Sequence, residues 1–197
     1  VVGALSMLGL PLDRDKVLYY SNKIEGHPDN VAPCIHGGLV VSSLDGDDVV
    51  SIKLSMGNAF KFLALIPSFE LSTSKARSVL PTEITLKDGV FNSSRLAVLL
   101  ASLVEGRDEY LAFGLQDRFH QPYRGSLIPG FEEIMAFVKS TPALGAYLSG
   151  AGPTIMVLAK KEDNSTLNLI KDFVSGLEKH WEIVELELDT EGFSVEK

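Results

Sequence analysis

The stretch Ala146–Ala159, AYLSGAGPTIMVLA, decides the fold, because two apolar segments flank a turn of glycines and a proline. Residues 146–148 and 154–159 are predicted strands, since the second segment is a run of apolar and β-branched residues and the glycines between them favour a turn. An amphipathic pattern predicts a helix over residues 167–180, and the alternating EIVELEL predicts a strand over residues 182–188. This half of the sequence therefore has the order strand, strand, helix, strand.

The preceding segments complete the pattern. Residues 60–66 are predicted to form a buried strand, and residues 92–104 a helix. The order strand, helix, strand, strand, helix, strand predicts an α+β fold of two layers, the ferredoxin-like or split βαβ arrangement. We also expect an apolar helix end over residues 1–10, helices over residues 15–24, 72–80, 109–115 and 131–139, strands over residues 39–43 and 49–54 joined by a turn at 45–47, and a short last segment at 193–195.

Composition limits the classes of function. The 197 residues are 45% hydrophobic, which is enough for a sizeable core. A net charge of -8 argues against a broad basic face for nucleic acid. Apolar runs such as residues 62–67 are far shorter than the roughly 20 residues needed to span a bilayer. Cys34 is the single cysteine, so an internal disulfide is excluded. We therefore expect a protein of the cytoplasm that binds neither nucleic acid nor membrane.

The run EGHPDNVAP, residues 25–33, packs several functional groups into a few residues and is followed by a glycine pair. One interpretation is a helix end and a proline turn, in which Asp29 or Asn30 caps the next segment. That interpretation leaves Glu25 and His27 unexplained, and so a binding or catalytic site is the alternative. A metal site is a third interpretation, although its spacing matches no standard zinc pattern. Its ligands would be His27, Asp29, Cys34 and His36.

The turn SGAGPT, residues 149–154, is open to two interpretations. It is a hairpin turn, or its glycines let the backbone approach a nucleotide closely. A phosphate loop of the P-loop type is excluded, because the turn lacks a Lys-Ser or Lys-Thr pair and a following helix.

Two arginines stand out in this acidic chain. Thr73 and Arg77 are four residues apart and would share one helix face, and Arg124 ends the segment DRFHQPYR, residues 117–124. Each arginine could simply be stacked or paired on the surface. The guanidinium group is also well suited to binding a carboxylate through two parallel hydrogen bonds.

Four segments, in this order, resemble the homoserine kinase family of the GHMP kinase superfamily. They are EGHPDNVAP (25–33) with Gly37-Gly38, TSKAR (73–77) with VLP (79–81), DRFHQPYR (117–124), and LSGAGPT (148–154). The glycine segment is typical of the superfamily, whereas HPDN and the arginine segments favour the homoserine branch.

The resemblance implies a division of the chain. Residues 1–38 would end the N-terminal lobe and carry a substrate motif, and residues 39–197 would form the C-terminal, ferredoxin-like GHMP kinase domain. The superfamily's phosphate loop, of the type Pro-x-x-x-Gly-Leu-Gly-Ser-Ser-Ala, does not occur in this sequence. We therefore expect a fragment covering the C-terminal two-thirds of such a kinase, without turnover by itself.

The resemblance also implies a reaction, in which ATP phosphorylates the side-chain hydroxyl of L-homoserine to O-phospho-L-homoserine in threonine biosynthesis. Asp29 would bind the ammonium group, and Asn30 would orient the attacking hydroxyl. The amide of Asn30 cannot accept the proton of that hydroxyl as a carboxylate could. Glu25 is the candidate Mg²⁺ ligand. The carboxylate of homoserine would bind Arg77 and Arg124, and Thr73 and His27 would complete the pocket. Gly150 and Gly152 would support the nucleotide.

Other functions stay open at this point. One is a different GHMP kinase, acting on mevalonate or a sugar. Another is a non-catalytic ferredoxin-like module that binds an amino acid without ATP. The resemblance is also compatible with a homodimer.

Overall fold

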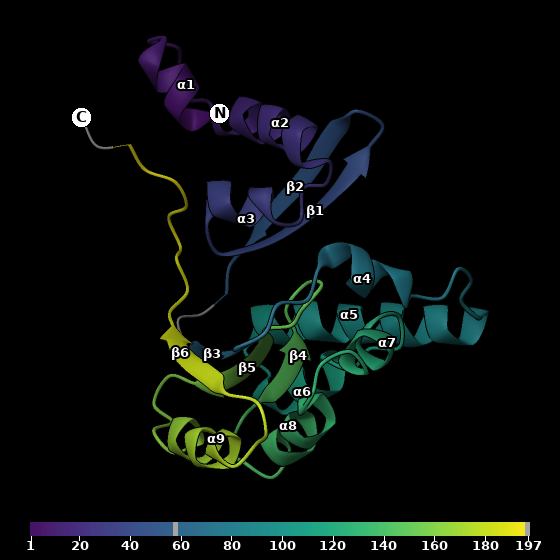
Figure 1. Cartoon of the computed structure of the whole chain (residues 1–197). Coiled ribbons are helices and arrows are strands. Elements are labelled where there is room, and N and C mark those ends of the chain that lie inside the picture. The colour runs from purple at the N-terminus through teal and green to yellow at the C-terminus, as the bar shows by residue number, and fades with distance from the viewer. Residues whose placement is uncertain (57–58, 196–197) are drawn as a thin grey trace. The chain divides into compact units, whose positions relative to one another are not determined.

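The computed structural model describes residues 1–56 and 59–195 (Figure 1). The chain folds into two compact units. The first comprises Val1–Met56 together with the chain from Leu188 onward, and the second comprises Gly57–Glu187. The second unit is thus inserted into the sequence of the first, and each is described by itself below.

A four-stranded antiparallel sheet forms the centre of the second unit. Its strands are β3 (Phe60–Pro67), β4 (Gly145–Leu148), β5 (Ile155–Lys160) and β6 (Trp181–Leu186). They lie in the order β4-β5-β3-β6, so the first strand of the unit is flanked by the third and the fourth. This is the strand order of the split βαβ arrangement. The predicted α+β, ferredoxin-like fold is confirmed.

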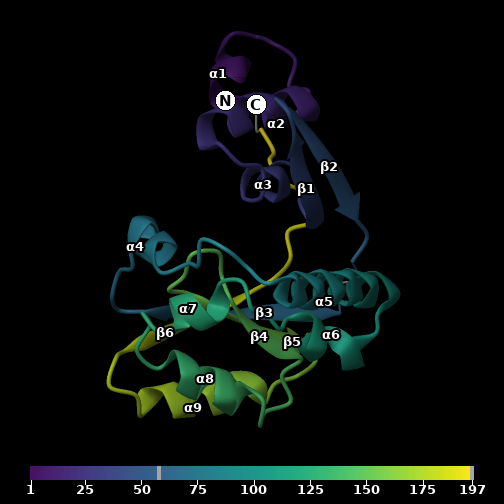
Figure 2. The same ribbon diagram turned by 90° about the vertical axis from the view of Figure 1, so that its right-hand side faces the viewer.

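Helices cover both faces of this sheet (Figures 1 and 2). Helices α8 (Phe131–Val138) and α9 (Thr166–Ser175) lie along one face, and α5 (Leu86–Glu105) lies along the other. The main core lies under α8 and α9, where Leu63 and Leu65 of β3 are fully buried. Burial of each such side chain stabilises the fold by about 1.5–3 kcal/mol. The shorter helices of this unit are α4 (Thr73–Ser78), η1 (Asp108–Tyr110), α6 (Leu111–Gly114) and α7 (Gln121–Gly125).

The described part of the first unit contains three helices and a β-hairpin: α1 (Val2–Met7), α2 (Arg14–Glu25), α3 (Val31–His36), β1 (Leu39–Asp45) and β2 (Asp48–Leu54). The side chain of Asp13 caps α2, and Gly26 ends it in a left-handed conformation with φ of 92°. Val17 and Leu18 of α2 pack in a small core with Ala32 and Ile35 of α3.

The chain after Leu188 returns to this first unit. The Gly38 N–H donates to the carbonyl of Asp189 at 2.6 Å, and Lys53 Nζ donates to the carbonyl of Thr190 at 2.7 Å. Gly37 and Gly192 approach each other so closely that a Cβ atom on either would collide with backbone atoms. The tail therefore fixes the segment that follows α3.

Several predicted elements have different bounds. The helix expected over residues 167–180 ends at Ser175, because Gly176 follows it. The one expected over 109–115 is split into η1 and α6, and the one over 92–104 is the second part of α5. Residues 193–195 form no strand. The structure adds α3 and α7, each with a proline in its first turn, where proline is tolerated.

The compact units divide the chain at different places from the predicted lobes. The hairpin of β1 and β2 and the tail belong to the first unit, and the second unit begins at Gly57. The predicted boundary between residues 38 and 39 separates the two lobes of a GHMP kinase, which are not the same as the compact units of this chain. That boundary stays a prediction. No helix in the described part of the chain is long and apolar enough to cross a bilayer.

Candidate active site

Helix α4 carries the first candidate segment of the second unit. The Ser72 hydroxyl accepts a hydrogen bond from the Lys75 N–H at 3.3 Å and so caps the helix. Ala76 is fully buried and anchors the helix, whereas Thr73 and Arg77 are exposed. Thr73 and Arg77 therefore lie on the solvent side of α4.

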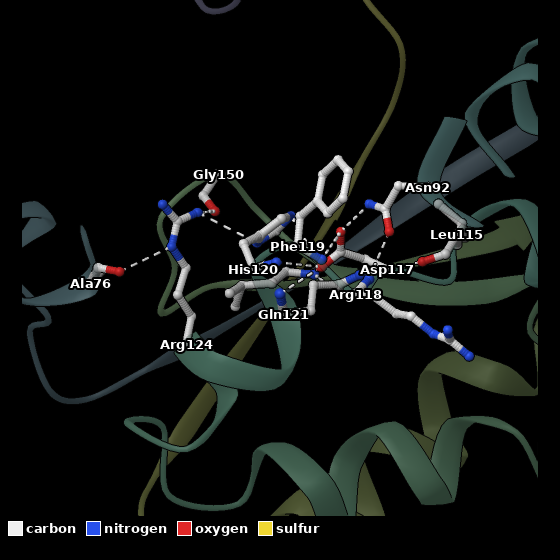
Figure 3. A network of polar contacts seen from close by, with 11 residues as sticks. Ala76, Asn92, Leu115, Asp117, Arg118, Phe119, His120, Gln121, Arg124 and Gly150 are labelled. Carbon is white, nitrogen blue, oxygen red and sulfur yellow. Dashed lines mark hydrogen bonds and ion pairs between the residues drawn. The ribbon is translucent and has the colours of Figure 1, made fainter. Parts of the chain in front are cut away.

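Asp117 organises the loop that leads to α7 (Figure 3). One carboxylate oxygen accepts from the amide of Asn92 at 2.5 Å and from the Phe119 N–H at 3.0 Å. The other accepts from the N–H groups of His120 at 2.8 Å and Gln121 at 2.6 Å. Burial by itself would raise the pKa of Asp117, but these hydrogen bonds outweigh it and hold the pKa below its ordinary value. The Asp117 carboxylate thus stays ionised and holds the backbone N–H groups at the start of α7.

His120 lies between Asp117 and Arg124. Its Nδ1 is 3.4 Å from Arg124 Nη1, and its Nε2 is 3.8 Å from the Asp117 carboxylate. Burial lowers the pKa of His120, Asp117 raises it and Arg124 lowers it again, with a net shift below the ordinary value. The lowered pKa favours the neutral ring, and in that form Nδ1 can accept from Arg124 when the proton is on Nε2.

Helix α7 is attached to its surroundings through two side chains (Figure 3). Gln121 is 8% exposed; its Oε1 accepts from the Leu148 N–H at 2.8 Å, and its Nε2 donates to the Leu115 carbonyl at 3.3 Å. Arg124 Nε donates to the Ala76 carbonyl at 3.2 Å, and its Nη1 donates to the Gly150 carbonyl at 2.9 Å. Arg124 therefore joins helix α4 to the glycine turn.

The glycine turn between β4 and β5 is closed by its own backbone. The Ser149 N–H donates to the Thr154 carbonyl at 2.9 Å, and the Gly152 N–H donates to the Ser149 carbonyl at 2.8 Å. Gly150 has φ of 52°, and a Cβ atom on it would meet nothing within 4 Å. Gly152 has φ of 83° and packs against Leu148, so a Cβ atom there would lie 3.0 Å from that side chain. A ligand can thus approach the backbone at Gly150, whereas Gly152 shapes the turn.

The remaining candidates lie in the first unit, between α2 and α3. His27 Nδ1 is 2.8 Å from a carboxylate oxygen of Asp29, so these two side chains form a pair. Asn30 is at the N-cap position of α3, but its side chain makes no capping hydrogen bond among the described residues. The capping interpretation therefore does not account for the amide of Asn30, which is exposed.

The metal interpretation of this segment finds no support. Within residues 1–56 and 59–195, no three His, Cys, Asp or Glu side chains are placed together to hold a metal ion. Glu25 is the last residue of α2 and is exposed. Mg²⁺ commonly binds one or two protein carboxylates and completes its shell with water and substrate phosphates. One exposed carboxylate is therefore a suitable donor for Mg²⁺ that arrives with a nucleotide.

The predicted residues thus fall into two sets, one in each unit. His27 and Asp29 are in contact, with Glu25 and Asn30 close by in sequence. Arg124 contacts the backbone of α4, which carries Thr73 and Arg77, and the backbone of Gly150. Sequence reasoning missed the side chains that hold Arg124 in place. An aspartate four residues before a helix start that contains a proline was the available signal for Asp117. His120 and Gln121 belong to the segment DRFHQPYR, but no local pattern indicated their contacts or those of Asn92.

Comparisons with known proteins first define a class. Residues 99–173 match the family described as GHMP kinases C terminal. The fold is similar to that of a Streptococcus pneumoniae phosphomevalonate kinase, with a TM-score of 0.70 and 14% identity over 92% of this chain and 65% of the other chain. Residues 99–173 are therefore similar to the C-terminal domain of the GHMP kinases, and the fold of the chain agrees with this class.

Within this class, the similarity to one branch is far stronger. The chain is 45% identical to a homoserine kinase of Clostridium beijerinckii over 99% of its length, and 41% identical to one of Clostridium botulinum over 98%. A crystal structure of homoserine kinase from Cytophaga hutchinsonii superimposes with a TM-score of 0.86, at 25% identity, over 96% of this chain and 62% of that one. The chain spans 65% of the length of these two curated relatives. The predicted resemblance to homoserine kinases is confirmed.

Proposed function

We propose that the protein carrying this sequence is a homoserine kinase. It transfers the γ-phosphoryl group of ATP to the side-chain hydroxyl of L-homoserine and forms O-phospho-L-homoserine, a step of threonine biosynthesis, in the cytoplasm. The observation that carries this proposal is the 45% identity to a homoserine kinase over 99% of the chain. Mevalonate and phosphomevalonate kinases share only 14–17% identity with the chain, so they support the fold and not a substrate.

The side chains of the second unit suit the carboxylate of an amino acid. Arg124 uses Nε and Nη1 for backbone carbonyls, and its Nη2 has no hydrogen-bond partner among the described residues. This nitrogen can donate to a carboxylate without breaking the existing contacts. Arg77, exposed on α4, supplies the second positive charge, and Thr73 lies one helical turn away on the same helix.

The side chains of the first unit suit the ammonium and hydroxyl groups of an amino acid. In our proposal Asp29 binds the ammonium group through the oxygen that His27 leaves open, and His27 holds the carboxylate in place. Asn30 orients the hydroxyl that attacks the phosphoryl group. An amide cannot take up the proton of that hydroxyl, so catalysis would depend on positioning and on neutralising charge.

Nucleotide and metal complete the proposal. The open backbone at Gly150 would support ATP, and Gly152 would keep the turn in shape. Glu25 would hold Mg²⁺, which neutralises phosphate charge during phosphoryl transfer. We also propose a homodimer as the assembly, which analytical ultracentrifugation can test.

A substrate panel tests the proposed function. The protein is incubated with Mg²⁺-ATP and L-homoserine, mevalonate, phosphomevalonate or galactose, and phosphorus NMR follows the products. We expect a new phosphate monoester with homoserine alone. Faster phosphorylation of another acceptor would assign the protein to a different GHMP kinase. Calorimetry that detects homoserine binding but neither nucleotide binding nor turnover would instead indicate an amino acid binding module.

A further inference from the structure

Two side chains of helix α7 make hydrogen bonds to the backbone at the start of the glycine turn. Gln121 Oε1 accepts from the Leu148 N–H at 2.8 Å, and Arg124 Nη1 donates to the Gly150 carbonyl at 2.9 Å. Leu148 ends β4, and Gly150 lies two residues further on. The two side chains are three residues apart on α7, so they share one side of the helix. Together they hold the start of the turn against α7 (Figure 3).

Gln121 is the more buried of the two side chains. Its side chain is 8% exposed, and its amide uses both ends, accepting from Leu148 and donating to the Leu115 carbonyl. A buried amide that loses one partner leaves an unsatisfied polar group, which is costly. Gln121 therefore fixes the position of α7 relative to β4, and with it the starting point of the Arg124 side chain.

Arg124 extends this connection to α4. Its Nε donates to the Ala76 carbonyl, one residue before Arg77. The same guanidinium group therefore contacts the segment with the second substrate arginine and the turn proposed to support the nucleotide. A carboxylate that binds Nη2 would restrain both contacts, because the guanidinium group is planar and rigid.

We propose that Gln121 is a positioning residue that couples the binding of homoserine to the binding of nucleotide, through α7, Arg124 and the glycine turn. The inference rests on the proposed function and adds to it a linkage between the two substrates. Such a linkage is reciprocal, since each ligand must raise the affinity for the other by the same factor.

Calorimetry on the protein carrying this sequence measures this factor. Homoserine is titrated with and without a non-hydrolysable ATP analogue and Mg²⁺, and the analogue is titrated with and without homoserine. In the unmodified protein we expect each ligand to raise the affinity for the other about fivefold or more. In Gln121→Met, which keeps an unbranched side chain of similar length but removes both hydrogen bonds, we expect the factor to fall close to one.

Gln116→Met is the matched control, because Gln116 is exposed in the same loop and accepts only from Arg95 Nε at 3.3 Å among the described residues. It should keep the factor of the unmodified protein. The inference is overturned if Gln121→Met keeps that factor, or if the control loses as much.

The unmodified protein supplies a second measurement that does not depend on a folded variant. The Leu148 N–H donates a hydrogen bond to Gln121 Oε1, and its hydrogen exchange should slow when either ligand binds alone. Unchanged exchange together with a coupling factor of one overturns the inference and leaves the proposed function in place. Absence of any homoserine binding overturns the proposed function itself.

Discussion

Replacing Arg124 with alanine tests two roles of this residue, the binding of the substrate carboxylate and the contacts that hold nearby backbone. The change removes Nη2, which we propose binds the substrate carboxylate, and the hydrogen bonds to the Ala76 and Gly150 carbonyls. A hydrogen bond to a charged group contributes about 1.5–3 kcal/mol. Since about 1.4 kcal/mol is a factor of ten, homoserine affinity should fall about 10- to 150-fold. The affinity for nucleotide, measured without homoserine, should change far less.

The same variant should be less stable. Its two lost backbone contacts are partly or fully exposed to solvent, so we assign them about 1 kcal/mol each. For a domain of this size, about 2 kcal/mol lowers the melting temperature by about 4–8 °C. Calorimetric titration and a thermal melt measure the two effects. Arg124→Lys is the control, because lysine keeps the charge but cannot bridge both carbonyls. Equal losses of homoserine and nucleotide affinity in Arg124→Ala would refute the carboxylate role.

Three further changes test other parts of the structure. Asn30→Ala should lower the turnover rate by about 100-fold with a modest change in homoserine affinity; steady-state kinetics would contradict the positioning role if the rate stayed near that of the unmodified protein. Gly192→Ala should cost about 1–3 kcal/mol in urea unfolding, because its Cβ would collide with the Ile35 carbonyl at a φ of 74°; an unchanged midpoint would show that the tail does not hold this contact. Asp163 accepts from Ser165 and Thr166; burial opposes ionisation, but these hydrogen bonds lower its pKa to about 2. Its stabilising effect is therefore complete above the ordinary pKa of 3.8 and is lost as the pH falls toward about 2, so the stability difference between the unmodified protein and Asp163→Ala should shrink over that range, and a constant difference would contradict this role.

The sequence predicted the sheet of the second unit better than its helices. The apolar runs at residues 60–66 and 154–159 predicted buried strands because both are short, and the second is also rich in β-branched residues. Helix ends were harder, since residues 176–180 continue an amphipathic pattern although Gly176 ends the helix. The short helices α3 and α7 escaped prediction because tertiary contacts, and not helix propensity, stabilise helices of five or six residues.

The candidate site was predicted at the level of residue types and not of contacts. Arg124 stood out as a cation at the end of the segment DRFHQPYR in an acidic chain. Its bonds to Ala76 and Gly150 join residues 48 and 26 positions apart, which no local pattern can indicate. Gln121 was missed for the same reason, since a buried glutamine looks like any surface glutamine in a sequence.

The inserted arrangement of the second unit affects the order in which the protein can fold during synthesis. Strands β3 and β6, near the two ends of the insertion, are paired, with Phe62 opposite Leu186. The insertion is therefore a closed loop of chain that can complete its own sheet once Leu186 has left the ribosome. The first unit must wait longer, because the Asp189 carbonyl and Gly192 that hold its α3 segment are synthesised later. The loop between α2 and α3, with Asn30, would thus be the last part of the candidate site to be fixed.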